Sequence, residues 1–394
     1  MSTPPAGPLA GIRVLEVGHV LAGPFGGMLL ADLGADVIKI EPIDGDLSRQ
    51  VGSQVIDGHN VYFASLNRNK RSIHIDLATP EGQEQLGALA ATAHALLVNM
   101  RPSTIRKLGL DYESLRRFNE KIVCVAVTGY GLDGPAADWP AFDYVIQAGT
   151  GVAAMTGEPD GPPALAGYSA VDNSTGAMAA LGLVAKVLEG KGGQVDVSLF
   201  DALAEWMGYP AYYTGYGGAP LPRTGAAHAA IAPYGPYTAG DGKVVYLGLQ
   251  NEREWARFCA EVLGQPALAS DRRFSANAER VAHRQELDAL INAAFATHSA
   301  EDVLARLDAA QIANARMNTV QEFLEHPQLA ARDRWRTVQS PAGPIRALLP
   351  PFGMSDTEPR MGPIPSVGEH TDAILGELGY DAAAIARFRS SGAI

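Results

Sequence analysis

One carboxylate in this chain is well placed for covalent chemistry. Asp172 precedes the residues Asn-Ser-Thr-Gly and a stretch with apolar side chains at helical spacing, namely Met178, Leu181, Ala185 and Leu188. We expect the N–H groups of the first helical turn to face the Asp172 carboxylate and keep it ionised. An ionised carboxylate that is held in place can act as a nucleophile towards acyl groups. The alternative is an ordinary helix N-cap, since Asp is among the preferred capping residues.

The elements around Asp172 form an α/β pattern. Gly190, Gly192 and Gly193 predict a left-handed end of the helix, and residues 194–199 alternate as in a strand. Further strands are expected at 12–17, 36–41, 72–76, 95–99 and 121–127, and helices at 25–33 and 80–92. This alternation predicts a doubly wound parallel sheet with helices on both faces.

The length of 394 residues predicts more than one domain. Two stretches read as linkers: 204–224, which is rich in Gly, Pro, Ala and Tyr, and 325–341, which precedes a proline-rich stretch at 341–365. A strand at 243–249 and helices at 254–262, 284–297 and 300–310 predict a smaller α+β domain over 225–324. The large domain then covers 1–203 and is completed by 342–394.

The composition excludes several classes of function. A net charge of -12 argues against a nucleic-acid partner, and Cys124 and Cys259 make neither a disulfide framework nor a zinc site. No apolar run approaches the ~18 residues of a membrane span. Residues 1–9 lack the basic and apolar regions of a signal peptide. We therefore expect a cytoplasmic protein without a membrane partner.

A nicotinamide-dependent dehydrogenase is one competing interpretation. The glycine-rich turn 18–27 lies between a strand and a helix, and Glu41 ends the next strand, where such enzymes bind the ribose. However, the G-x-G-x-x-G spacing is absent, as are the phosphate-loop and H-E-x-x-H zinc motifs. Residues 167–171 contain half of a serine-hydrolase elbow but lack its final glycine.

Several segments in order resemble the class III CoA-transferases, which include formyl-CoA transferase, the carnitine CoA-transferase and the α-methylacyl-CoA racemases. The matching segments are residues 9–15, 19–24, 30–41, 67–73, 76–77, 80–82, 99–102, 129–131, 142–144, 172–176 and 193–199. Each segment alone is a weak signal, but their order over nearly the whole chain is highly specific.

The resemblance implies a Rossmann-like large domain, a smaller domain and an interlocked homodimer. It also implies that Asp172 is the nucleophile, which forms a mixed anhydride and then an aspartyl-CoA thioester. CoA thioesters would be substrates, with no metal and no permanently bound cofactor. A third interpretation is a CoA-binding protein without catalytic activity.

The CoA site is likewise inferred from the resemblance. Its matching positions are His19, Val20, Leu21, Ala22, Asn99, Met100, Arg101 and Lys107. Cationic positions known in formyl-CoA transferase read Pro42, Ala78 and Pro140 here, so Arg49, Arg68 or Arg71 would contact the phosphates instead. Taken alone, Arg101 and Lys107 also fit a solvated basic face, and His19 fits a packed loop residue.

The resemblance leaves a choice between transfer and racemisation. A racemase of this kind has a histidine before a second aspartate, but here that pair is Phe142 and Asp143, and a phenyl ring cannot accept a proton. We therefore expect CoA transfer. The expected substrate-binding residues are Tyr130, Phe142, Gln147, Arg223 and His228. The segment through residues 250–255 resembles members that act on C4 and C5 dicarboxylates such as succinate, mesaconate, citramalate or itaconate.

Overall fold

The computed structural model describes residues 7–51, 55–56 and 59–394. The chain divides into two compact units. The large unit contains the chain up to Thr150, Ala166–Tyr209 and Ala331–Ile394, and the small unit contains Gly151–Leu165 and Pro210–Ala330. Segment 151–165 thus clusters with the small unit, whereas the sequence pattern placed it in the large domain.

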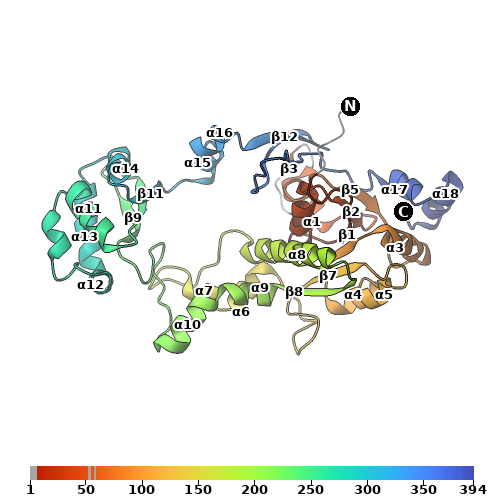
Figure 1. Cartoon of the computed structure of the whole chain (residues 1–394), viewed down its shortest axis with the longest axis horizontal. Coiled ribbons are helices and arrows are strands. Elements are labelled where there is room, and N and C mark those ends of the chain that lie inside the picture. Colours follow the sequence, from red (N-terminus) through yellow and green to blue (C-terminus); the bar gives the residue numbers. More distant parts are fainter. Residues whose placement is uncertain (1–6, 52–54, 57–58) are drawn as a thin grey trace. The chain divides into compact units, whose positions relative to one another are not determined.

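A six-stranded parallel sheet forms the centre of the large unit (Figure 1). Its strand order is β5-β2-β1-β6-β7-β8. The strands are β1 (Arg13–Val17), β2 (Asp36–Glu41), β5 (Arg71–His74), β6 (Ala95–Asn99), β7 (Val123–Thr128) and β8 (Gly193–Ser198). Most strand residues are buried, because a parallel sheet is covered on both faces. The chain therefore has a mixed α/β fold, as its alternating pattern predicts.

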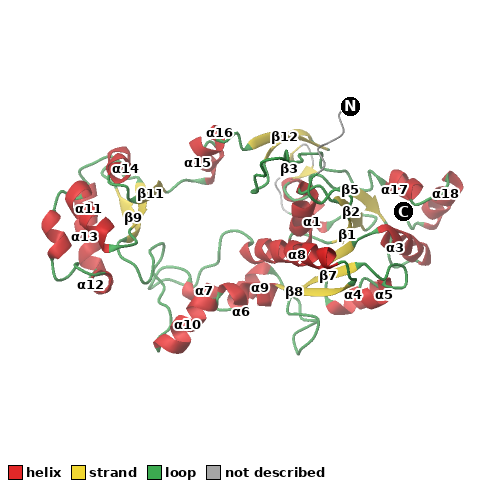
Figure 2. Cartoon of the chain, viewed as in Figure 1, coloured by secondary structure: helices red, strands yellow, loops and turns green. Residues whose placement is uncertain are grey.

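Helices cover both faces of this sheet (Figure 2). One face packs through Leu15, Ile38 and Leu96 against apolar side chains of five helices. These helices are α3 (Pro80–Thr92), α4 (Pro102–Leu108), α5 (Tyr112–Leu115), α17 (Thr371–Glu377) and α18 (Ala382–Ser391). Helices α1 (Ala22–Asp32) and α8 (Ala170–Glu189) pack on the other face.

Helices α1 and α8 approach at backbone distance. A β-carbon built at Gly26 would lie 2.8 Å from the carbonyl oxygen of Gly176, and one at Gly176 would lie 2.5 Å from the carbonyl oxygen of Ala22. Any larger residue at Gly26 or Gly176 would force the helices apart. This close crossing places Ala22, the first residue of α1, beside Gly176, which lies one helical turn after Asp172 in α8.

Shorter elements complete the large unit. They are η1 (Leu47–Arg49), β3 (Val55–Ile56), β4 (His59–Asn60), α2 (Val61–Ala64), α6 (Asp143–Gly149), α9 (Leu199–Trp206), β12 (Trp335–Ser340) and β13 (Gly343–Leu348). Strands β12 and β13 form an antiparallel hairpin. Phe63, Val338 and Ile364 form a small core between α2 and this C-terminal segment.

The small unit has its own core. Strands β9 (Tyr234–Thr238), β10 (Val244–Gly248) and β11 (Ala313–Arg316) form an antiparallel sheet in the order β11-β10-β9. Buried Trp255, Phe258 and Phe295 pack with the helices around this sheet. The helices are α11 (Glu252–Arg257), η2 (Phe258–Val262), η3 (Pro266–Ser270), α12 (Asn277–Ala282), α13 (Arg284–Phe295) and α14 (Ala300–Ala309).

Several helices were not expected from the sequence pattern. Among them, α6 is short, and α10 (Gly208–Gly217) consists of Gly, Pro, Ala, Tyr and Thr and has no buried residue. Neither shows the apolar stripe on which a sequence-based helix prediction depends. The remaining short helices are α7 (Val152–Met155), α15 (Val320–Leu324) and α16 (Pro327–Ala331). Among the described residues, no helix is long and apolar enough to cross a membrane.

Candidate active site

Asp172 lies in the first turn of α8, as the third helical residue. The N-cap is Ser169, whose side chain makes no capping hydrogen bond, and Gly190 ends the helix in the left-handed conformation. Asp172 is therefore not the N-cap that the sequence offered as an alternative. Its carboxyl group is mostly buried, so its reactivity depends on its immediate neighbours.

A second carboxylate caps the start of α8. Oδ2 of Asp143 accepts hydrogen bonds from the N–H groups of Val171 and Asp172, at 2.7 and 2.9 Å. Its Oδ1 accepts from Nε2 of Gln147 at 2.6 Å, and Oε1 of Gln147 accepts from the N–H of Ala166 at 3.0 Å. Asp143 and Gln147 are both buried. The free N–H groups at this end of α8 are thus directed to Asp143.

This arrangement changes the expected charge state of Asp172. We expected the helix N–H groups to keep its carboxylate ionised, and that expectation is wrong. Burial raises the pKa of Asp172 to about 7, and the negative charge of Asp143 acts in the same direction. A carboxylate with a high pKa is a stronger base and a stronger nucleophile once it has lost its proton.

The residues expected to contact the substrate lie in different surroundings. Gln147 is 1% exposed and holds Asp143, so its amide is already bonded at both ends. Phe142, by contrast, is 73% exposed. Tyr130 packs against the rings of Trp139 and Phe200. We therefore replace the substrate-binding role expected for Gln147 by a structural one at the start of α8.

Tyr62 is a site residue that the sequence did not reveal. It lies in α2, and its side chain hydrogen-bonds to Ser169, the N-cap of α8. Burial raises its pKa, and the charges of Asp172 and Asp143 add to this effect. A neutral phenol therefore lies near Asp172. No motif around Tyr62 distinguished it from an ordinary half-buried tyrosine.

The glycine-rich turn after β1 is held by Asn99. The side-chain oxygen of Asn99 accepts from the N–H of His19 at 2.7 Å, and its amide donates to the carbonyl of His19 at 2.9 Å. Leu21 and Ala22 are buried at the start of α1. Asn99, at the end of β6, thus holds the turn that contains His19, Leu21 and Ala22.

A cavity of about 370 Å³ opens at the carboxyl ends of the strands. Its lining includes His19 and Met100 from the expected CoA site. The rest of the lining is Val17, Ile40, Glu41, Pro42, Ile43, Asp44, Ile75, Asp76, Leu77, Ala78 and Leu108. Ligands of open α/β sheets bind at this edge. Burial lowers the pKa of His19, which favours a neutral imidazole.

The arginines expected to replace missing phosphate ligands are paired with carboxylates. Arg71 donates two hydrogen bonds to Asp36 and two to Glu377, at the amino ends of the strands and opposite to the cavity. Arg68 pairs with Asp32. Arg71 is therefore not retained in the proposed CoA site.

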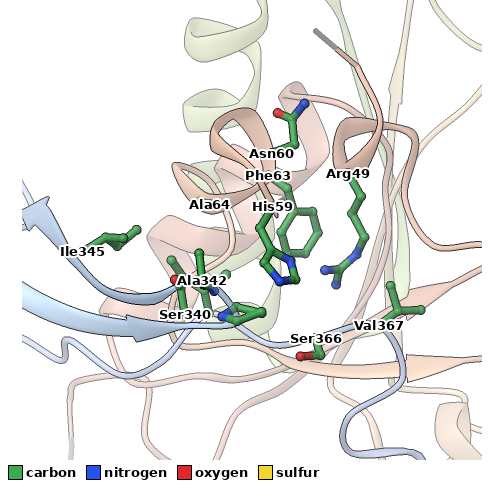
Figure 3. Close-up of a pocket in the computed structure, with 12 residues that line it drawn as sticks. Arg49, His59, Asn60, Phe63, Ala64, Ser340, Ala342, Ile345, Ser366 and Val367 are labelled. Atoms are coloured by element: carbon green, nitrogen blue, oxygen red, sulfur yellow. Dashed lines mark hydrogen bonds between the residues drawn. The ribbon is translucent and has the colours of Figure 1, made fainter. Parts of the chain in front are cut away.

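Arg49 is held in the same manner. Its guanidinium binds both carboxylate oxygens of Glu41 and lies 3.5 Å from the centre of the Phe63 ring. A separate cavity of about 130 Å³ lies between Arg49, His59 and the β12–β13 turn (Figure 3). Of the other cations expected at the CoA site, Arg101, the N-cap of α4, and Lys107, in the last turn of that helix, are exposed.

Arg223 and His228 belong to the small unit. Nη1 of Arg223 is buried and has no hydrogen-bond partner among the residues that the structure describes. The ring of His228 stacks on Tyr234 at 5.3 Å, and its Nδ1 accepts from the N–H of Ala230. One nitrogen of the Arg223 guanidinium is thus left without a partner among the described residues.

Comparisons with known proteins support the same family along the whole chain. The model of CoA-transferase family III matches residues 9–371. Succinate–glutarate CoA-transferase of Agrobacterium fabrum is 36% identical over 384 residues, which cover 94% of this chain and 96% of that protein. Succinyl-CoA–D-citramalate CoA-transferase of Chloroflexus aurantiacus is 36% identical over 383 residues, which cover 95% of this chain and 92% of that protein.

A solved structure agrees with these sequence relatives. The crystal structure of a CAIB/BAIF family protein from Brucella suis matches with a TM-score of 0.83 and 34% identity, over 95% of this chain and 100% of that one. Both the sequence and the fold point to one family. The chain belongs to CoA-transferase family III.

Proposed function

We propose that this CoA-transferase works through covalent intermediates on Asp172. The Asp172 carboxylate attacks the donor thioester carbonyl, which forms a mixed anhydride and releases the CoA thiolate. The thiolate then attacks the aspartyl carbonyl, which gives an aspartyl-CoA thioester and frees the donor acid. The acceptor carboxylate reverses these two steps, so that it leaves as a CoA thioester and Asp172 is regenerated.

The observation that carries this proposal is the environment of Asp172. Its carboxyl group is mostly buried in the first turn of α8, and the N–H groups that would otherwise stabilise its charge are bound by Asp143. A desolvated carboxylate with few hydrogen bonds reacts more readily with a thioester than a solvated one. No separate general base is needed, because carboxylate and thiolate are themselves the nucleophiles.

We place CoA along the turn and the cavity of the large unit. The nucleotide would occupy the cavity that His19 and Met100 line, and the pantetheine arm would pass the turn of residues 18–22 towards Asp172. Lys107 is the cation proposed for a CoA phosphate, since its neighbour Leu108 lines the cavity and its side chain is exposed.

We propose C4 and C5 dicarboxylic acids as the acyl groups. The names of the relatives from Agrobacterium fabrum and Chloroflexus aurantiacus include succinate, glutarate and citramalate, all dicarboxylates. A second carboxylate needs a cation, because an unpaired buried charge is costly. The unpaired Nη1 of Arg223 supports this residue as that cation.

A heavy-oxygen experiment tests the covalent route. An acceptor such as glutarate, labelled with heavy oxygen in its carboxylates, is incubated with succinyl-CoA and the enzyme. In the proposed route the bridging oxygen of the second anhydride stays on the enzyme, so the peptide with Asp172 gains the label. Peptides with other carboxylates, such as Asp196, should stay unlabelled. In a separate measurement, Asp172→Asn should lower the rate of transfer by several orders of magnitude. Rapid transfer without label in Asp172 would contradict the proposal.

Racemisation is the second candidate, because the family resemblance includes racemases. Phe142 precedes Asp143 at the position where a racemase of this kind has its histidine. We therefore expect negligible exchange of the α-proton. Incubation of a 2-methylacyl-CoA in heavy water tests this, and deuterium uptake at the rate of thioester exchange would favour a racemase.

We also propose a homodimer. Leu181 and Leu188 of α8 are 70% and 80% exposed, and Trp206 of α9, a helix that packs on α8, is 57% exposed. Large apolar side chains on neighbouring elements indicate a surface that a partner covers. A second copy of the chain is the partner that the family resemblance implies.

A further inference from the structure

The turn that leads into α1 contains a strained residue. Val20 has a φ of +63°, in the left-handed region. A β-branched side chain rarely adopts this conformation, because its branches clash with the backbone there. Such a conformation persists only where surrounding groups hold it.

A buried carboxylate holds Val20. Oδ1 of Asp46 accepts from the N–H of Val20 at 3.2 Å and from the N–H of Ser48 at 2.7 Å. Oδ2 of Asp46 pairs with Nζ of Lys39 at 2.7 Å, and both side chains are fully buried. Nζ of Lys39 also donates to the carbonyl of Gly18 at 2.8 Å. Asp46 and Lys39 thus fix the backbone on both sides of His19.

Further buried charges fix the end of the turn. Glu16 pairs with Lys39 and Lys70, at 2.9 and 2.7 Å, and all three side chains are fully buried. Nζ of Lys70 donates to the carbonyl of Pro24 at 2.8 Å. A β-carbon at Gly27 of α1 would overlap the Glu16 carboxylate, so this glycine allows the cluster to lie beneath the helix.

The turn connects the two parts of the site. His19 lines the cavity at the carboxyl ends of the strands, and the carbonyl of Ala22 contacts Gly176, one helical turn after Asp172. A change of the backbone at Val20 would therefore move the turn relative to the helix that carries Asp172. A misplacement of about 1 Å at a reacting centre can lower the rate roughly 100-fold.

We propose that Asp46 is a positioning residue, whose buried carboxylate holds Val20 in the left-handed conformation and thereby sets the turn of residues 18–22 against the helix of Asp172. The proposal rests on the proposed function, because it assumes that a thioester lies along this turn. Asp46 itself does not touch the substrate. It acts through the backbone of Val20.

A double-mutant cycle with Asp46→Asn and Val20→Gly tests the proposal. Asparagine keeps one oxygen but weakens the link to Lys39, so Val20 can relax and kcat/KM for succinyl-CoA should fall roughly 10-fold to 100-fold. Glycine tolerates a positive φ without strain. In the Val20→Gly background, Asp46→Asn should therefore cost no more than about three-fold. Val20→Ala is the matched control, because it keeps a β-carbon and should rescue less.

Two further variants keep the test decisive if Asp46→Asn folds poorly. Val20→Pro cannot adopt a positive φ and lacks the N–H, so it should lower kcat/KM at least about 100-fold while the circular dichroism spectrum stays unchanged. Asp32→Asn removes a buried carboxylate paired with Arg68 at the far end of α1, and it should lower the melting temperature without a rescue by Val20→Gly.

The outcomes separate this proposal from the proposed function. Equal losses for Asp46→Asn in both backgrounds, or an active Val20→Pro, would overturn the positioning role even if Asp172 is the nucleophile. If the enzyme transfers CoA but Asp172 acquires no label, the covalent route fails, and the rescue in kcat/KM still decides the role of Asp46. If no thioester turns over, calorimetric titration with CoA takes the place of kcat/KM, and the same pattern of loss and rescue in affinity is expected.

Discussion

Replacing Asp143 with asparagine removes a buried negative charge beside Asp172 and keeps an oxygen at nearly the same place. The amide oxygen of the new side chain can still accept from the N–H groups of Val171 and Asp172, which Asp143 binds at 2.7 and 2.9 Å. The amide nitrogen of the new side chain would face Nε2 of Gln147, which donates to Oδ1 of Asp143 at 2.6 Å, so the Gln147 amide must turn over for the cap of α8 to survive. The variant then tests mainly the effect of the charge. We expect the pKa of Asp172 to fall.

The size of this change follows from the two causes of the raised pKa. The pKa of Asp172 rises from 3.8 to about 7, and burial is the larger cause. Asp143 therefore accounts for less than half of the rise, and removing its charge should lower the pKa by about 1, or about 1.4 kcal/mol. At pH 6 the ionised fraction of Asp172 would then increase about five-fold.

Other charged groups near Asp172 should not obscure the result. Helix α1 carries Asp32, at its far end and paired with Arg68, while β6 and β7 carry no charged side chain. The carboxylates of Asp196 in β8 and of Asp201 in α9 are bound to Leu132 and Ser198. Glu205 lies near the end of α9, and burial raises the pKa of the Tyr62 phenol in α2.

The assay is the pH dependence of kcat/KM for exchange between succinyl-CoA and labelled succinate. The wild-type rate should rise with pH to a plateau, with a midpoint near 7, because in the proposed mechanism only the ionised Asp172 attacks. In Asp143→Asn the midpoint should lie about one pH unit lower, and the plateau should be lower because a weaker base is a weaker nucleophile. Asp196→Asn is the matched control and should leave the midpoint in place. An unchanged or higher midpoint in Asp143→Asn would refute this explanation of the Asp172 pKa.

Three further predictions address stability, substrate choice and assembly. Asp172→Asn should stabilise the fold by up to about 4 kcal/mol above pH 7 and hardly at pH 4. The pKa of Asp172 is raised in the folded chain, so between pH 3.8 and about 7 the folded chain binds more protons than the unfolded chain. The cost of the buried negative charge in the wild type therefore appears only as the pH rises. Thermal melts at both pH values check this, and equal shifts would contradict it. Arg223→Gln should cost roughly 2–4 kcal/mol in transition-state binding for dicarboxylates and little for butyrate, as kcat/KM for each acid would show; equal losses would indicate a structural role. Light scattering should give twice 41.5 kDa over a wide concentration range, and a stable, active monomer would exclude the dimer.

The sequence by itself determined the sheet and the position of the nucleophile candidate. Strands 36–41 and 95–99 were predicted with the bounds that the structure has, because buried parallel strands are continuous apolar runs between clear turn signals. A helix that begins near Asp172 and ends at Gly190 was also predicted, since an apolar helical pattern follows Asp172 and glycines end it, but its N-cap is Ser169. These signals are local, so one sequence is sufficient to detect them.

Only the tertiary structure decided the chemistry around Asp172. Its high pKa depends on burial and on Asp143, which is 29 residues away and takes the N–H groups that we had assigned to Asp172 itself. The side chain of Gln147 donates a hydrogen bond to Asp143. Both residues lie in α6, a helix that has no apolar stripe from which a sequence pattern could predict it. No local pattern specifies which distant group accepts a given hydrogen bond.

The same reason applies to the turn of residues 18–22 and to the arginines. Arg71 resembled a phosphate ligand in the sequence, but the fold pairs it with Asp36 and with Glu377, which is 306 residues away. The strain at Val20 is likewise invisible in the sequence, since valine ordinarily avoids a positive φ and the turn depends on Asp46 beneath it. Residue types and spacing specify elements, whereas charge states and hydrogen-bond partners arise when separate elements are packed together.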